Sequence, residues 1–166
     1  MDMKWRRHFR RAKPEPRSLY GRWLLALLYG PPELIEHYGE PLGKLTMEQG
    51  NSQSAISDRL FMRLVAMRFM PGQPVRDISD YVAAIVMAMD RSVRFGRLEA
   101  EALIRHALGE ESVSLSGIDQ DLATRIRGGF VAAIIREKGL APEQVTRLVV
   151  EAEDWVASSG VQLIAP

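Results

Sequence analysis

The sequence predicts an all-α protein, a single compact bundle of about six helices with a basic N-terminal arm. Apolar residues recur at helical spacing in several long segments, and glycines and prolines separate these segments at short intervals. The short VQLI stretch near the end is the one candidate for a strand. A chain of 166 residues suits one domain with one core. We therefore divide it into an arm (1–17), a helical domain (18–160) and a tail (161–166).

The first elements of the helical domain are expected to be a helix, a short helical piece and a loop. Ser18 is a suitable N-cap for the first helix, which ends at Gly30. The Pro-Pro pair that follows opens a short helical piece ending at Gly39. Turn-forming residues are frequent over 39–53, so this stretch is predicted to be a loop.

Two helices are predicted in the middle of the chain. The first begins near Ser52 or Ser54 and runs to Met70, because its apolar residues are spaced by four, four and three: Ile56, Leu60, Leu64 and Met67. Prolines and a glycine then end it. Asp77 or Ser79 is expected to cap the helix that follows.

The remaining helices are bounded by clear start and stop signals. Gly109 occupies the C-cap position of one helix. Ser116 with Asp119 resembles a capping box, and it is expected to open a long helix that closes at Gly139. Pro142 then suits the first position of the last helix.

Gly128 and Gly129 interrupt the apolar pattern of the long helix before Gly139. We interpret the pair as a kink or a close helix crossing, with a hinge or a ligand approach as the alternative. The periodic apolar residues of all the helices predict the core, which should include Leu24, Leu28, Ile56, Leu60, Leu64, Val82, Ile85, Met89, Leu103, Ile118, Leu122, Ile126, Phe130, Ile134, Val145, Leu148 and Val156.

Basic and aromatic residues gather in the arm, although the formal net charge of the whole chain is only +1. The body that follows is therefore slightly acidic. The candidate residues for binding a partner or a polyanion are Lys4, Trp5, Arg6, Arg7, Phe9, Arg10, Arg11 and Lys13. In a helix, Trp5 and Phe9 would share one side, with the basic residues around them.

Several roles of the arm are compatible with this pattern. It is a solvated terminus, or its aromatic residues pack back onto the domain. As a basic amphipathic helix, it would suit an acidic groove of another protein or an anionic membrane surface. As an arginine-rich arm, it would bind RNA or DNA, with Trp5 and Phe9 stacking on bases.

The sequence predicts no metal and no cofactor. Cysteine is absent, which removes thiolate ligands and fits a cytoplasmic protein. The three histidines are scattered along the chain. Asp90 to Glu101 has the outline of a calcium loop, but Ser92 and Arg94 stand where carboxylates are needed.

The sequence also lacks the common catalytic motifs, since no P-loop, G-x-G-x-x-G or G-x-S-x-G pattern occurs. Carboxylates such as Glu151, Glu153 and Asp154 are expected to be solvated on a polar helix face. These observations favour a non-enzymatic protein–protein interaction or regulatory module in the cytoplasm, whose partner is another protein. The alternatives are polyanion (RNA or DNA) binding through the arm, and an enzyme whose site is assembled from distant helices.

Overall fold

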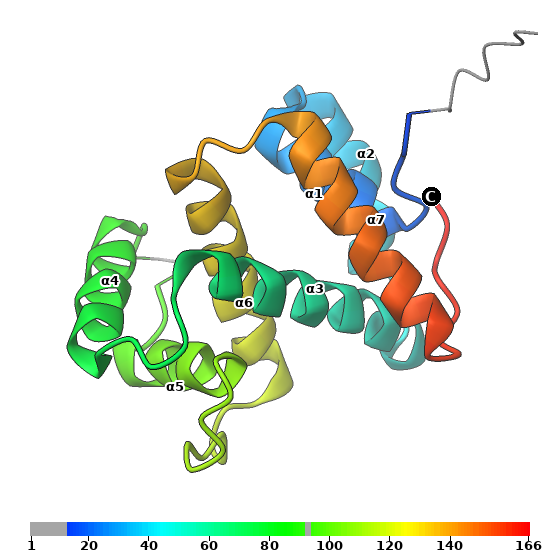
Figure 1. Ribbon diagram of the computed structural model, residues 1–166. Helices are drawn as coiled ribbons and strands as arrows, with labels where there is room; N and C mark the ends of the chain where they lie inside the picture. Colours follow the sequence, from blue (N-terminus) through cyan, green and yellow to red (C-terminus); the bar gives the residue numbers. More distant parts are fainter. Residues whose placement is uncertain (1–12, 92–93) are drawn as a thin grey trace, which may run out of the picture.

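The structure is a computed structural model that describes residues 13–91 and 94–166, apart from the side chains of residues 47 and 48. Within these residues it is all-helical and contains no strand, which confirms the predicted fold class (Figure 1). The helices are α1 (Leu19–Tyr29), α2 (Pro32–Gly43), α3 (Met47–Arg68), α4 (Val75–Ala88), α5 (Arg97–Ala107), α6 (Gln120–Glu137) and α7 (Pro142–Ser158).

The helix α3 is the central element of the bundle. It packs against α6, α7, α5 and α1, while α1 pairs with α2 and α4 pairs with α5. Figure 1 shows α4 and α5 at one end of the molecule, and α1 and α2 at the other end beside α7. Within the described residues, no helix is both long and apolar enough to span a bilayer.

One hydrophobic core runs through the whole bundle. Most of the predicted core side chains are fully buried, including Leu24, Leu60 and Ile134. The other predicted members pack against the core while partly buried, namely Leu28, Ile85, Met89, Ile118, Leu122 and Leu148. Burying one such aliphatic side chain stabilises the fold by roughly 1.5–3 kcal/mol.

The stretch 39–53 is helical for most of its length, so the predicted loop is wrong. The second helix continues past Gly39 to Gly43, with Pro41 in its last turn, and is a full helix of 12 residues. The third helix begins at Met47 because Thr46 and Gln49 form a capping box. The Gln49 backbone N–H donates to Thr46 Oγ1 at 3.3 Å, and the Thr46 backbone N–H donates to Gln49 Oε1 at 3.1 Å.

Two other predicted helix starts are also wrong. The α4 helix begins at Val75 after Pro74, before either predicted cap. The N-cap of α6 is Asp119, whose Oδ1 accepts from the Leu122 backbone N–H at 2.7 Å. Ser116 instead forms hydrogen bonds with Ser114 in the preceding turn.

The glycine pair in α6 marks a close approach, but of a side chain instead of a second helix. The helix runs unbroken through both glycines. A Cβ atom at Gly129 would lie 3.1 Å from Phe95 Cε1, whereas one at Gly128 would meet no atom within 4 Å. Phe95 comes from the segment between α4 and α5, and its ring contacts that of Phe130. Gly129 therefore lets this ring pack against the α6 backbone.

Candidate functional site

Lys13 of the arm is exposed. The other predicted binding residues of the arm lie outside the residues that the structure describes: Lys4, Trp5, Arg6, Arg7, Phe9, Arg10 and Arg11. The role of the arm therefore stays a prediction. What the structure does show is how the chain that follows the arm is held on the body.

The carboxylate of Glu153 on α7 holds the chain at the base of the arm. Glu153 is fully buried, so the prediction of a solvated side chain is wrong for this residue. Its Oε1 accepts from the backbone N–H and the Oγ of Ser18 at 2.9 and 2.5 Å, and its Oε2 accepts from the Arg17 backbone N–H at 2.9 Å. Ser18 Oγ in turn accepts from the Gly21 backbone N–H at 3.0 Å. We call this arrangement the Glu153 clamp.

The backbone of α1 lies close to side chains of α7 around the clamp. A Cβ atom at Gly21 would lie 2.6 Å from Val149 Cγ1 and 2.8 Å from Glu153 Oε1, so only glycine fits. The C-terminal tail joins the same junction, where Ile164 O accepts from the Leu19 backbone N–H at 2.7 Å. One signal of the burial was present in the sequence, because Glu153 continues the four-residue spacing of the buried Val145 and Val149.

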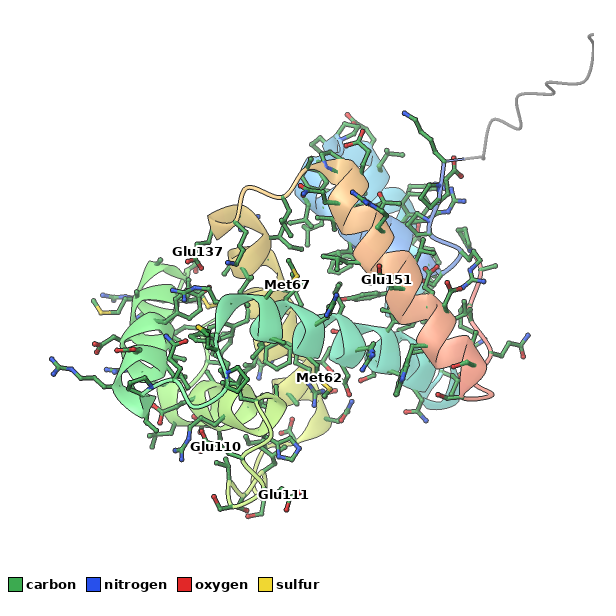
Figure 2. All side chains as sticks on the ribbon, in the orientation of Figure 1. Met62, Met67, Glu110, Glu111, Glu137 and Glu151 are labelled. Carbon is green, nitrogen blue, oxygen red and sulfur yellow. The ribbon has the colours of Figure 1, made fainter. Side chains whose placement is uncertain are left out.

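A shallow furrow lies along the surface between α3 and α7. Two adjoining hollows of about 200 and 250 Å³ form it, and both are lined by Leu148 and Glu151 of α7. The first hollow also contacts Met67, and Figure 2 shows Met67 and Glu151 between the two helices, with Met62 on the opposite side of α3. We call this surface the α3–α7 furrow.

Arginines flank the α3–α7 furrow. Arg59 and Arg63 stand four residues apart on α3, and Arg147 lies on α7. The Arg59 guanidinium stacks 4.9 Å from the ring centre of Trp155, which is 47% exposed. No ion pair joins Arg63 or Arg147 to the part of the chain that the structure describes.

Sequence reasoning did not find these arginines. Arg59, Arg63 and Met67 share one face of α3 at four-residue spacing, which is a visible signal. The sequence does not indicate which other helix this face meets, and the furrow exists only because that helix is α7. The concentration of positive charge therefore depends on a contact between distant segments.

Away from the furrow, an ion pair links α3 and α6. Asp58 Oδ1 of α3 and Arg127 Nη1 of α6 lie 2.7 Å apart, in a geometry that makes an ion pair but not a hydrogen bond. Burial raises the pKa of Asp58, and the charge of Arg127 opposes that shift. We assign this pair to the packing of α3 on α6.

A second polar cluster connects α3, α4 and the end of α6. Arg68 pairs with Glu137 at 2.8 Å, and its guanidinium stacks 4.5 Å from the Tyr81 ring centre. Burial, together with the nearby Glu137, raises the pKa of Tyr81 well above its usual value. The Tyr81 ring acts as a packing surface for Arg68 and for the edge of Phe69.

The loop with the calcium-loop outline uses its last carboxylate within the protein. Glu101 accepts a hydrogen bond from Ser79 and pairs with Arg105 at 3.6 Å. Among the residues that the structure describes, no three histidine, aspartate or glutamate side chains gather as metal ligands would. The absence of a bound calcium ion therefore stays a prediction.

The chain was compared with protein-family models, curated proteins and solved structures, and no match was found in any of the three comparisons.

Proposed function

We propose that this protein is a non-enzymatic interaction or regulatory module of the cytoplasm that binds an acidic, amphipathic segment of another protein along the α3–α7 furrow. The observation that carries the proposal is the arginine-flanked apolar surface. Arg63 and Arg147 are exposed and have no ion-pair partner in the described part of the chain. Three arginines outnumber the one carboxylate, Glu151, among the residues that line the furrow. Guanidinium groups recognise carboxylates with paired hydrogen bonds, so an acidic partner is the complement.

The apolar residues of the furrow indicate that the partner also carries hydrophobic side chains. Met67 and Leu148 line it, and Met67 has the adaptable side chain that is common at binding surfaces. Trp155 is half-exposed beside Arg59, and exposed tryptophan and arginine are the residues that most often dominate binding energy at interfaces. A helical segment with acidic flanks would match both features.

The ionisable groups at the helix contacts already have partners within the protein, which supports a role other than catalysis. Glu153 is engaged in the Glu153 clamp, and Asp58 is paired with Arg127. The Tyr81 ring is stacked against the Arg68 guanidinium. The interactions of each of these groups are accounted for by contacts within the protein, without a role in binding a substrate.

The proposal can be tested with a designed peptide of defined charge. The probe is a fluorescein-labelled amphipathic helix with leucine and tryptophan on one face and glutamate on its flanks. Its control has lysine in place of each glutamate. By fluorescence anisotropy with the full-length protein, we expect the glutamate peptide to bind about tenfold or more tightly than the lysine peptide.

Matched charge reversals locate the site. Replacing Arg63 and Arg147 by glutamate should weaken binding of the glutamate peptide about tenfold. The control reverses Arg76 and Arg125, two exposed arginines that do not line the furrow, and changes the net charge equally. Equal weakening by both double variants would show that the peptide responds to net charge alone, which would contradict the proposal. Unchanged binding to the variant with Arg63 and Arg147 replaced would also contradict it.

Polyanion binding through the arm is the second candidate function. It rests on the concentration of basic residues before residue 17 and on the two aromatic residues among them. Such binding would leave the α3–α7 furrow free. The two functions therefore respond to different variants.

A further inference from the structure

The largest of the hollows described lies at the N-terminal end of α3, away from the α3–α7 furrow. It is a partly enclosed cavity of about 620 Å³ between the α1–α2 pair and the N-terminal parts of α3 and α6. We call it the α1–α6 cavity. Its volume falls within the range of about 300–1,000 Å³ that is typical of small-molecule sites.

One wall of the α1–α6 cavity is aromatic and apolar. Tyr20 and Trp23 of α1 contribute neighbouring rings, whose centres are 5.9 Å apart and whose planes are inclined by 41°. Leu42 and Leu45 extend this wall from the end of α2. The α2 backbone at Gly39 lies beside the indole, since a Cβ atom there would be in van der Waals contact with Trp23 Nε1 at 3.4 Å. A flat apolar group therefore has a surface to stack on.

The facing wall carries neutral amides and hydroxyls. Gln120 Nε2 donates to Ser54 Oγ at 2.5 Å, which joins the rims supplied by α6 and α3. Asn51 and Thr124 are exposed on the same rim. These groups donate and accept hydrogen bonds, so they would orient a polar substituent of a ligand.

The charge of the lining restricts the ligand further. Asp121, in the first turn of α6, is the one carboxylate among the described lining residues, and no lysine, arginine or histidine lines the cavity there. Burial raises the pKa of Tyr20, so its phenol is neutral as well. An anionic ligand would meet a negative charge at the mouth with no cation to balance it.

We propose that the α1–α6 cavity binds an uncharged small molecule with a flat apolar body and a hydrogen-bonding substituent. The body stacks against Trp23, whose ring contacts the buried ring of Tyr20, and the substituent faces the amide and hydroxyl rim. This site is independent of the proposed function in the α3–α7 furrow, because the two share no lining residue. Either can fail without the other.

The first test compares two probes that share one ring system. The reporter is N-phenyl-1-naphthylamine, an uncharged dye whose fluorescence rises in apolar sites. We expect full-length protein to bind it, and uncharged 2-naphthamide to displace it about tenfold more effectively than anionic 2-naphthoate. Absence of dye binding, or equal displacement by both competitors, would overturn the proposal.

Leucine substitutions at two helical glycines, one inside the cavity and one outside it, test whether the dye binds in the cavity. Gly50 lines the cavity within α3, and a Cβ atom there meets nothing within 4 Å, so the backbone accepts a side chain and Gly50→Leu places one at the cavity wall. Gly128 is also helical, its Cβ position is equally open, and it lies outside the cavity. We expect Gly50→Leu to weaken dye binding about tenfold and Gly128→Leu to change it less than about twofold.

A third variant tests the charge argument by a gain of binding. Asp121→Lys should strengthen displacement by 2-naphthoate about tenfold, because the anion then meets a cation at the mouth. Circular dichroism checks that all three variants are folded. Dye binding that survives in folded Gly50→Leu, or displacement by 2-naphthoate that does not respond to Asp121→Lys, would overturn the assignment.

Discussion

At the scale of single residues, the Glu153 clamp explains how the first helix is attached. One carboxylate accepts from two backbone N–H groups and a hydroxyl at the start of α1. Charge-assisted hydrogen bonds of this kind contribute more than neutral ones, and they also balance the cost of burying the charge. The clamp satisfies the backbone N–H groups of Arg17 and Ser18, just before α1, and the Ser18 hydroxyl satisfies that of Gly21. The N–H groups of Leu19 and Tyr20 donate instead to Ile164 O and Gln53 Oε1.

We predict that Glu153→Gln destabilises the protein by about 2–3 kcal/mol. An amide nitrogen would replace one oxygen and would face an N–H donor instead of accepting from it. Urea denaturation of the wild-type protein and the variant measures the decrease in the free energy of unfolding. The control is Glu151→Gln, two residues away and exposed, which should cost less than about 0.5 kcal/mol. Similar small values for both variants would show that the clamp contributes little.

At the scale of elements, α3 separates the two proposed sites. It has 22 residues, which corresponds to a length of about 33 Å. Its first turns line the α1–α6 cavity with Gly50 and Ser54, and its later turns border the α3–α7 furrow with Arg63 and Met67. Because the two surfaces share no lining residue, each can be altered by substitutions that leave the other unchanged.

The element before α1 yields a prediction about truncation. Deleting residues 1–13 should change the free energy of unfolding by less than about 1 kcal/mol, because the contacts of Glu15, Pro16, Arg17 and Ser18 remain. Deleting residues 1–17 should cost more, since it removes Arg17 from the Glu153 clamp. Chemical denaturation compares the two. A large loss in the shorter truncation would mean that Trp5 or Phe9 belongs to the core.

At the scale of the whole molecule, a basic arm is attached to a slightly acidic body. The two parts oppose each other in binding a polyanion, so affinity near physiological salt should be weak. Binding carried by phosphate contacts depends steeply on salt, since each contact releases counterions. Salt dependence therefore separates an arm that binds nucleic acid from one that does not.

If about five basic residues of the arm contact single-stranded phosphates, log K against log salt should have a slope of about −3.5. Replacing Arg6, Arg7, Arg10 and Arg11 by alanine should flatten that slope. Replacing Trp5 and Phe9 should weaken binding but leave the slope unchanged, because stacking releases no counterions. Titration of labelled RNA at several salt concentrations measures both effects. No binding even at about 50 mM salt would eliminate this function.

The sequence signals that correctly predict helix starts and core residues extend over only a few neighbouring residues. Pro142 begins the last helix as expected, and the apolar periods of α3 and α6 identified Leu60 and Ile134 as core. The stretch around Thr46 contains many turn-forming residues, which predict a loop. It is the start of α3 because of a capping box that depends on only two side chains. Propensity is a weak guide where a cap and packing act together.

The sequence by itself determined the all-α class, most helix ends and the apolar faces, because helical spacing and caps are properties of neighbouring residues. Only the tertiary structure decided that Glu153 is buried, that Arg63 and Arg147 lie along one furrow, and that Trp23 faces a cavity. Each of these depends on which helices meet. That choice comes from packing the whole core, where residues far apart in the chain contribute together.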